Sequence, residues 1–315
     1  MTKVDEAIES IQADTAPDPV SRSVSYSQYT LWSTCPHQWK LKYVDGFREE
    51  SNINLIFGTA VHDTVQHWLK LYYGDSAIQA KAFDMHEMLK ERMLVLAKDK
   101  LIEKGLTTKE ELMEYYLDGC NILDHMRAQV KTWFPHAGYQ LIGVEVPLLK
   151  ELSNNITFKG FIDVVVYHKS AKTLYIYDFK TSGRGWSDYQ KKDAAKTDQL
   201  LLYKMFYSEL FGMPLDSIKI EFIILKRKVS QNPEYVVKHV AGFEPAHGKP
   251  SLKKARERFD KFLTETFNVD GTVRLNNLHP TPSDKNCKFC PFNNDATKCQ
   301  FSVNLKSGRK ITKAK

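Results

Sequence analysis

Long apolar segments are missing from this chain of 315 residues. No run of about 18 apolar residues occurs, so we expect no helix that crosses a membrane. Residues 1–20 also lack the basic and then apolar pattern of a secretory signal peptide, and they contain five acidic residues instead. We therefore expect a cytoplasmic protein without a membrane partner.

The chain contains five cysteines. This number is low for the length of the chain and it is odd, so a secreted disulfide scaffold is not expected. The phosphate-binding pattern G-x-x-x-x-G-K-[ST] is absent, which argues against an ATP-driven motor. Hydrophobic residues make up 42% and charged residues 26% of the chain, as in ordinary globular proteins. The net charge of +7 suits an anionic partner, but many enzymes that bind nothing charged are equally basic.

Hydrophobic periodicity and turn residues divide the chain into helical and strand-rich stretches. Helices are expected from about Gln28 to Tyr43 and over about 57–73, 76–104, 108–133, 194–211 and 251–267. Strands are expected over 139–149, 157–168, 173–180, 218–226 and 234–240, the first three as an antiparallel meander. This alternation predicts an α/β fold, with a mixed central sheet flanked by helices.

The same pattern predicts one domain over residues 21–302. It would contain a helical lobe at about 75–135, a catalytic sheet at about 139–240 and a cysteine-rich segment at about 280–300. Residues 1–20 are expected to form a mobile acidic tail and residues 303–315 a flexible basic tail.

Two acidic residues interrupt neighbouring apolar strands. Asp163 lies within the first, and Asp178 stands two residues before Lys180 at the end of the next. Positions i and i+2 of a strand share a face, so Asp178 and Lys180 should project together, with Asp163 beside them. Two crowded carboxylates favour a divalent cation, and hard oxygen ligands select Mg²⁺ or Mn²⁺. The alternative is that both acids cap strand ends and pair with surface lysines.

At these residues the sequence resembles the PD-(D/E)XK nucleases, and within them the RecB-type branch. Asp163 matches the acid of the G-h-h-D motif, where h is apolar, and Asp178-Phe179-Lys180 matches the D/E-x-K motif. His62 follows Gly58-Thr59 as in that branch, and Gln199 with Tyr203 matches Q-x-x-x-Y. The resemblance covers about residues 24–300 and implies a restriction-endonuclease-like core.

The resemblance also implies roles for the matched residues. The expected metal ligands are His62, Asp163, Asp178 and Phe179. Lys180 would act on the attacking water, and Gln199 and Tyr203 would position the nucleic acid strand near the active site. Glu145, in the segment Gly143–Pro147, would assist near the metal.

Four of the five cysteines suggest a second metal site. Cys287, Cys290 and Cys299 are spaced as C-x₂-C-x₈-C, and Cys35 makes a fourth thiolate, enough for a tetrahedral zinc or a [4Fe–4S] cluster. One cysteine before the core and three after it resembles the iron–sulfur RecB-type nucleases, such as AddB-type domains and CRISPR-associated exonucleases. The gap of eight is longer than usual there, which leaves zinc and unligated cysteines open. Cys120 is expected to be a buried apolar residue.

The loop after Lys180 contains Arg184 and Trp186 between glycines. Beside a catalytic centre, Arg184 could grip a phosphate and Trp186 could stack on a base, although a solvated turn is equally compatible with the pattern.

Together these residues predict a metal-dependent deoxyribonuclease, most simply an exonuclease on single-stranded DNA or DNA ends. Such a protein would act in recombination, repair or replication, in a bacterium or inside a virus-infected host cell, with DNA and a separate helicase or recombination protein as partners. The alternatives are a structure-specific endonuclease of the same fold and a non-catalytic nucleic-acid-binding module.

Overall fold

The computed structural model describes residues 22–47, 49–74, 77–153, 155–229, 238–293 and 295–301. Its described residues fall into two compact units. The first comprises Ser51–Leu148 and Phe161–Gly248, and the second comprises the residues up to Glu50, Leu149–Gly160 and those from Lys249 onward. The expected tails at 1–20 and 303–315 lie outside the described residues, and the single-domain organisation stays a prediction.

The predicted α/β class is confirmed by a mixed sheet of six described strands flanked by helices. The strand order is β1-β3-β4-β5-β6, and β2 also pairs with β3. Strands β3 and β4 are antiparallel, β4 and β5 parallel, and β5 and β6 antiparallel. The strands are β1 (Arg22–Val24), β2 (Tyr139–Glu151), β3 (Ile156–His168), β4 (Thr173–Ser182), β5 (Ile218–Lys226) and β6 (Val240–Phe243).

Two strands differ from the sequence prediction. The three residues of β1 are too few to show an alternating pattern, and they join the sheet by pairing in parallel with the start of β3, Val24 opposite Phe158. Most of the strand expected over 234–240 falls in residues 230–237, which lie outside the described part of the chain, and the described strand β6 begins at Val240 and continues to Phe243.

The helix predicted over 76–104 is divided in the structure, because a polar side chain caps the start of a second helix. Asp84 accepts hydrogen bonds from the backbone N–H groups of His86 and Glu87, both at 3.0 Å, and this cap divides the predicted helix 76–104. No described helix combines the length and apolar character needed to cross a membrane. The helical segments are α4 (Ile53–Tyr73), α5 (Ala77–Ala82), α6 (Met85–Ala97), the π-helix η1 (Lys98–Ile102), α7 (Lys109–Ala128), α8 (Val130–Trp133), α9 (Asp188–Lys192), α10 (Ala194–Phe211) and the 3₁₀ turn η2 (Leu215–Ser217).

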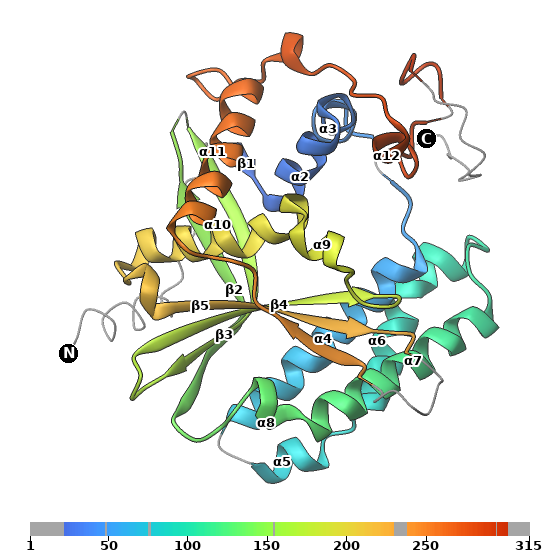
Figure 1. Ribbon diagram of the computed structural model, residues 1–315. Helices are drawn as coiled ribbons and strands as arrows, with labels where there is room; N and C mark the ends of the chain where they lie inside the picture. The colour runs from blue at the N-terminus through green and yellow to red at the C-terminus, as the bar shows by residue number, and fades with distance from the viewer. Residues whose placement is uncertain are drawn as a thin grey trace. The chain divides into compact units, whose positions relative to one another are not determined.

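The sheet of the first unit presents different residues to the helices on its two faces (Figure 1). On one face Val164, Tyr177, Phe179 and Ile223 join a buried core with α4, α6 and α7. Alternate residues point to the other face, where α10 packs against β4 and β5. Asp178 lies on this second face, because it alternates with Tyr177 and Phe179 along β4.

A cluster of ion pairs, with Arg227 and Asp118 largely buried and Lys228 and Glu114 exposed, joins α7 to the end of β5. Arg227 Nε lies 2.9 Å from Asp118 Oδ2, and the Arg227 guanidinium lies 3.2 Å from the centroid of the Tyr115 ring. Lys228 Nζ lies 2.8 Å from Glu114 Oε1 and 3.0 Å from Asp118 Oδ2. Two of the three cations that end β5 are therefore neutralised by acids of α7.

The second unit contains α2 (Tyr26–Thr34), α3 (Pro36–Tyr43), α11 (Lys249–Thr266), the 3₁₀ turn η3 (Leu275–Asn277) and α12 (Asp284–Cys287). The single helix expected over 28–43 is wrong, because Pro36 lacks the N–H that would continue it and instead starts a new helix after Cys35. Aromatic rings of α2 and α11 pack together, with Tyr29 and Phe259 at 5.6 Å and Trp32 and Phe262 at 5.4 Å between centroids.

Candidate functional site

The centre of the site is the point where the backbone ladder between β3 and β4 ends. The ladder runs from His168 opposite Thr173 to Val164 opposite Tyr177. The Phe179 N–H then donates not to a backbone carbonyl but to Oδ2 of Asp163, at 2.6 Å. A carboxylate thus takes the place of the next backbone acceptor, which satisfies a buried donor where the two strands separate.

Asp178 and Lys180 come together on β4, beside this fork. Asp178 is 1% exposed, and Lys180 Nζ lies 2.6 Å from its Oδ2. That same Oδ2 atom is buried and makes no hydrogen bond of acceptable geometry among the described residues. A buried carboxylate oxygen with spare acceptor capacity is therefore held against a partly exposed ammonium group.

His62 reaches the fork from α4. The helix passes close to β4, since a Cβ atom on Gly58 would lie 3.2 Å from Thr181 Oγ1. One turn later, His62 places its Nδ1 atom 3.6 Å from Asp163 Oδ2, and its ring lies edge-on to Phe179 with centroids 5.8 Å apart. Gly58 therefore permits the close approach that brings the histidine to the carboxylates.

The sequence analysis missed Gln66, which lies one turn after His62 on the same face of α4. Its Nε2 atom donates to Glu145 Oε1 at 2.6 Å and to the Asp163 carbonyl at 3.3 Å. Glu145 has a left-handed backbone, with φ of 50°, which is uncommon for a residue other than glycine. The spacing of four residues from His62 was the only signal that could have identified Gln66.

Gln199 and Tyr203 share one face of α10, and Gln199 Nε2 donates to the Tyr203 hydroxyl at 3.2 Å. Tyr203 is 3% exposed, and burial followed by the charge of Asp178 raises its pKa. The hydroxyl is therefore neutral at physiological pH and close enough to the carboxylates to be influenced by them.

Burial dominates the electrostatics of the fork. It raises the pKa of Asp163 to about 7 and that of Asp178 to about 6, and the Lys180 charge opposes the rise in both. Burial and then Lys180 lower the pKa of His62 to about 4, so its imidazole is neutral near pH 7. Two carboxylates and a neutral imidazole are the donors that Mn²⁺ and Mg²⁺ sites use.

Three other predicted site residues lie on β4 or in the loop that follows it. The Phe179 ring belongs to the core, so only its backbone could serve as the predicted metal ligand. Arg184 is exposed on the loop after β4. Trp186 is partly buried against Phe222 and Phe243, with ring centroids at 5.0 and 6.0 Å.

Neither expected metal site is preformed. Within the described ranges, no group of three or more His, Cys, Asp or Glu side chains is gathered as it would be around a metal ion. The donor chemistry at the fork nevertheless fits a divalent cation, because Asp178 has an unsatisfied buried oxygen and His62 is neutral. The ligand set at the fork stays a prediction.

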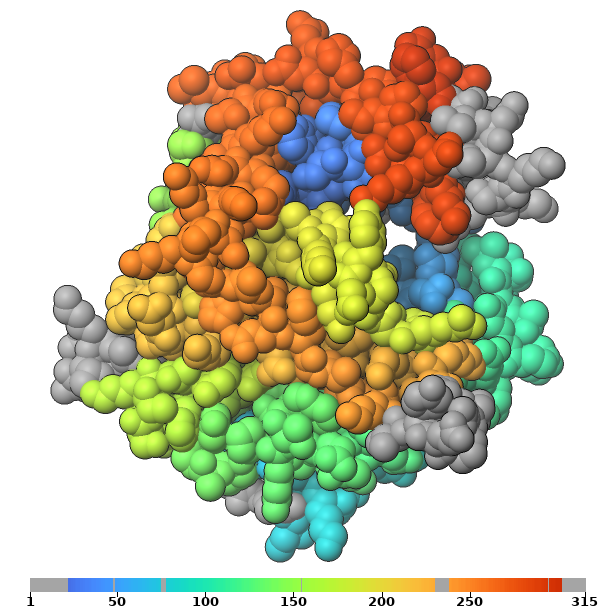
Figure 2. All heavy atoms as spheres, viewed as in Figure 1, coloured from blue at the N-terminus to red at the C-terminus, as the bar shows by residue number. Residues whose placement is uncertain are grey.

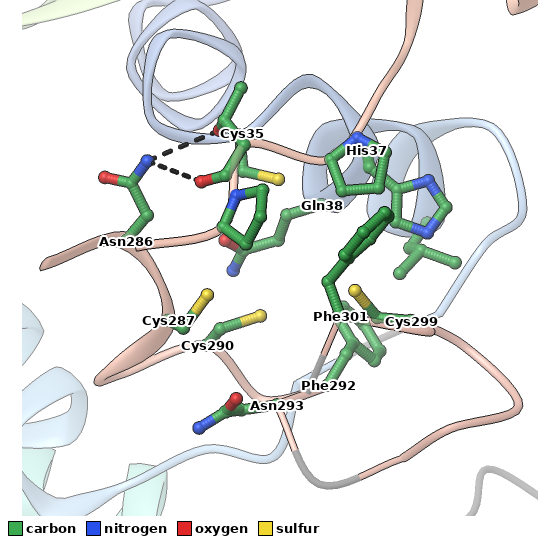
Figure 3. A pocket seen from close by; sticks show the side chains of 14 residues that line it. Cys35, His37, Gln38, Asn286, Cys287, Cys290, Phe292, Asn293, Cys299 and Phe301 are labelled. Atoms are coloured by element: carbon green, nitrogen blue, oxygen red, sulfur yellow. Dashed lines mark hydrogen bonds between the residues drawn. The ribbon is translucent and has the colours of Figure 1, made fainter. Parts of the chain in front are cut away.

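The four cysteines of interest lie in the second unit and line one cavity (Figure 3). Cys35, Cys287, Cys290 and Cys299 are all free thiols. Burial, and then the charges of the other three cysteines, raise the pKa of the Cys290 thiol to about 11. Cys120, which was expected to be buried, is partly buried in α7, where it packs against the core of the first unit.

Hydrogen bonds hold the two ends of the second unit around this cavity. Thr281 Oγ1 donates to the Thr34 carbonyl at 2.8 Å, and His37 Nε2 lies 2.8 Å from the Lys298 carbonyl. The cavity is therefore closed by segments more than 240 residues apart in sequence, Thr34 and Thr281 being separated by 247 positions.

Comparison with known proteins gives one family. Residues 23–294 match the family model described as the PD-(D/E)XK nuclease superfamily, and this range includes every residue of the fork described above. No curated protein matches the chain.

Because burial raises the pKa of Asp163, this carboxyl should make the metal-free protein less stable as the pH rises from about 4 to about 7. The folded state keeps the proton that the unfolded chain releases, at a cost on the order of 1.4 kcal/mol for each unit of pKa shift. Asp163→Asn keeps an acceptor for the Phe179 N–H but cannot ionise. In EDTA, the variant should melt above the wild type at pH 8 and lose this advantage at pH 4. An equal difference at both pH values would contradict the interpretation.

Proposed function

This chain belongs to the PD-(D/E)XK nuclease superfamily, and we propose that it is a metal-dependent deoxyribonuclease that degrades single-stranded DNA or DNA ends. Family membership implies a nucleic acid substrate and the hydrolysis of phosphodiester bonds. The observation that carries the proposal is the fork, where Asp163, Asp178 and Lys180 meet beside His62. These are the residues that matched the motifs of the family.

We assign Asp163, Asp178, His62 and the backbone of Phe179 to a divalent cation. When bound, a cation of this kind lowers the pKa of a coordinated water and offsets negative charge on the phosphate. The unsatisfied oxygen of Asp178 and the neutral imidazole of His62 support this assignment. Gln66 would fix the Asp163 backbone and Glu145 in place through its two hydrogen bonds.

Other residues of the chain have separate roles in the reaction. Lys180, whose side chain is 32% exposed while the side chain of Asp178 is 2% exposed, can donate a hydrogen bond to the water or to the developing charge on the phosphate. The water gives up one proton as its oxygen bonds to phosphorus, the bond from phosphorus to the 3′ oxygen breaks, and the 3′ oxygen takes up one proton, so that none is gained or lost overall. The products carry a 5′ phosphate and a 3′ hydroxyl. Gln199 and Tyr203 would position the strand.

We further propose that the cysteine cavity holds a [4Fe–4S] cluster, with zinc as the alternative occupant. Four thiols line it, which matches the ligand number of either group. The raised pKa of Cys290 means that a thiolate there is unfavourable without a positive centre to stabilise it. Bound metal would join segments that are far apart in sequence, so metal-binding energy would contribute to the stability of the second unit.

Lys180→Ala should reduce cleavage by about a hundredfold or more, because it removes a donor worth on the order of 3 kcal/mol to the transition state. The measurement is the initial rate on labelled DNA with Mg²⁺ or Mn²⁺, with EDTA as the blank. Lys131→Ala, an exposed lysine of α8, is the control and should keep the wild-type rate. A Lys180→Ala protein with more than about a tenth of that rate would rule out the assignment of Lys180.

Closed circular single-stranded DNA should survive incubation that degrades the same DNA after it is linearised, because an exonuclease needs an end. Strands labelled at the 5′ or 3′ end would then give the polarity. Cleavage of the circle at a comparable rate would identify an endonuclease, and binding without any cleavage in either metal would identify a non-catalytic module.

Protein purified without oxygen should be brown and contain about four irons per chain. Cys35→Ala and Cys299→Ala should each lower both the iron content and the melting temperature, whereas Cys120→Ala should change neither. About one zinc and no iron per chain would replace the cluster by a zinc site. Protein without metal on these cysteines would refute the metal site and leave the nuclease proposal standing.

A further inference from the structure

The catalytic face of the sheet continues beyond the fork onto β5 and β6. Asp178 is in register with Phe222, which is in register with Phe243. Four residues further along β4, and therefore on the same face, Ser182 is in register with Lys226. Residues in register on neighbouring strands project to the same face, so Lys226 shares the face of Asp178 and Lys180. Strand spacings place the Cα atoms of Lys180 and Lys226 about 8 Å apart.

Aromatic rings and lysines cover this face next to the loop after β4. Trp186 packs on Phe222 and Phe243, as described above. Lys196 Nζ lies 5.2 Å from the centroid of the Trp186 ring, and Lys191 Nζ lies 5.9 Å from that of Phe243. Two ammonium groups are therefore held against neighbouring rings by cation–π contacts.

The loop after β4 holds Lys226 beside Lys191 and Lys196. Gly185 has a left-handed φ of 93°, and a Cβ atom there would lie 2.8 Å from Lys226 Cδ. The loop is fixed by Ser182, whose hydroxyl donates to the Gly185 carbonyl at 3.0 Å and accepts from the Gly185 N–H at 3.1 Å. The aliphatic part of the Lys226 side chain thus lies against Gly185, in space that a larger side chain at position 185 would fill.

The three lysines have fewer carboxylate partners than their neighbours Arg227 and Lys228. In the part of the chain that the structure describes, no ion pair involves Lys196 or Lys226, and Lys191 has only the exposed Asp188 at 3.7 Å. Burial, and then the charges of Lys238 and Lys191, lower the pKa of Lys226. Like charges that are gathered with few acids beside them are stabilised by an anion.

We propose that Lys191, Lys196 and Lys226 bind the phosphodiester backbone of the nucleic acid strand next to the bond that is cleaved. The inference rests on the proposed function and adds to it a backbone-binding site on α9, α10 and β5. Figure 2 shows the yellow segment of α9 at the surface, where a strand can reach it. Trp186 supports the lysines as a positioning residue, because its ring already contacts Phe222 and Lys196.

The test measures binding of the full chain to a short dye-labelled oligodeoxynucleotide in EDTA, by fluorescence anisotropy over a range of salt concentrations. Each of Lys191→Gln, Lys196→Gln and Lys226→Gln should weaken binding severalfold and reduce the slope of log K against log[salt] by about one. The triple variant should reduce the slope by about three. Lys226→Arg should restore the slope lost in Lys226→Gln, because it keeps the charge.

Lys70→Gln and Lys131→Gln, both exposed lysines of the first unit, are controls that should keep the wild-type slope. Single-stranded and duplex probes are compared in parallel, and a larger loss with the single strand would assign the site to a single strand. A triple variant that melts like the wild type and keeps the wild-type slope with both probes would overturn the inference.

Failure of the proposed function gives a different result. A wild-type protein that neither binds nor cleaves nucleic acid would refute both proposals. A wild type that cleaves DNA, with a triple variant of unchanged salt dependence, would refute only the lysine site.

Discussion

The hydrogen bond from the Phe179 N–H to the Asp163 carboxylate is the contact on which the site depends. It ends the β3–β4 ladder by giving a buried backbone donor a side-chain acceptor, so the strands separate without an unsatisfied N–H. The same bond points the Asp163 carboxylate toward His62 and leaves Asp178 beside Lys180. One hydrogen bond thus both ends the pairing of the two strands and positions a carboxylate of the candidate site.

This arrangement costs stability. Two carboxylates are buried close together, and burial raises the pKa of both into the range from about 6 to about 7. A single ammonium, that of Lys180, offsets part of the cost, and Asp178 Oδ2 keeps an unused acceptor position. A site that is poorly satisfied in the metal-free protein is suited to gain free energy when a divalent cation binds.

The basic residues at the end of β5 differ in the groups that surround them. At the end of β5, Arg227 and Lys228 are paired with Asp118 and Glu114, and so hold α7 in place. Their neighbour Lys226 lies on the face of Asp178, where Lys191 and Lys196 contact aromatic rings. Adjacent cations of one basic run therefore have different surroundings: Lys226 is the last residue of β5 and shares the face of Asp178, whereas Arg227 and Lys228 follow the strand and pair with acids of α7.

The sequence by itself determined the α/β class, the main helices and strands, and the set of acidic, basic and histidine residues that the fork brings together. It could do so because apolar periodicity and motif spacing are local properties. Only the tertiary structure decided the short strand β1, the role of Gln66 and the register that puts Lys226 on the face of Asp178. These features depend on contacts between distant segments, and no local pattern encodes which side chains meet across a sheet or a helix crossing.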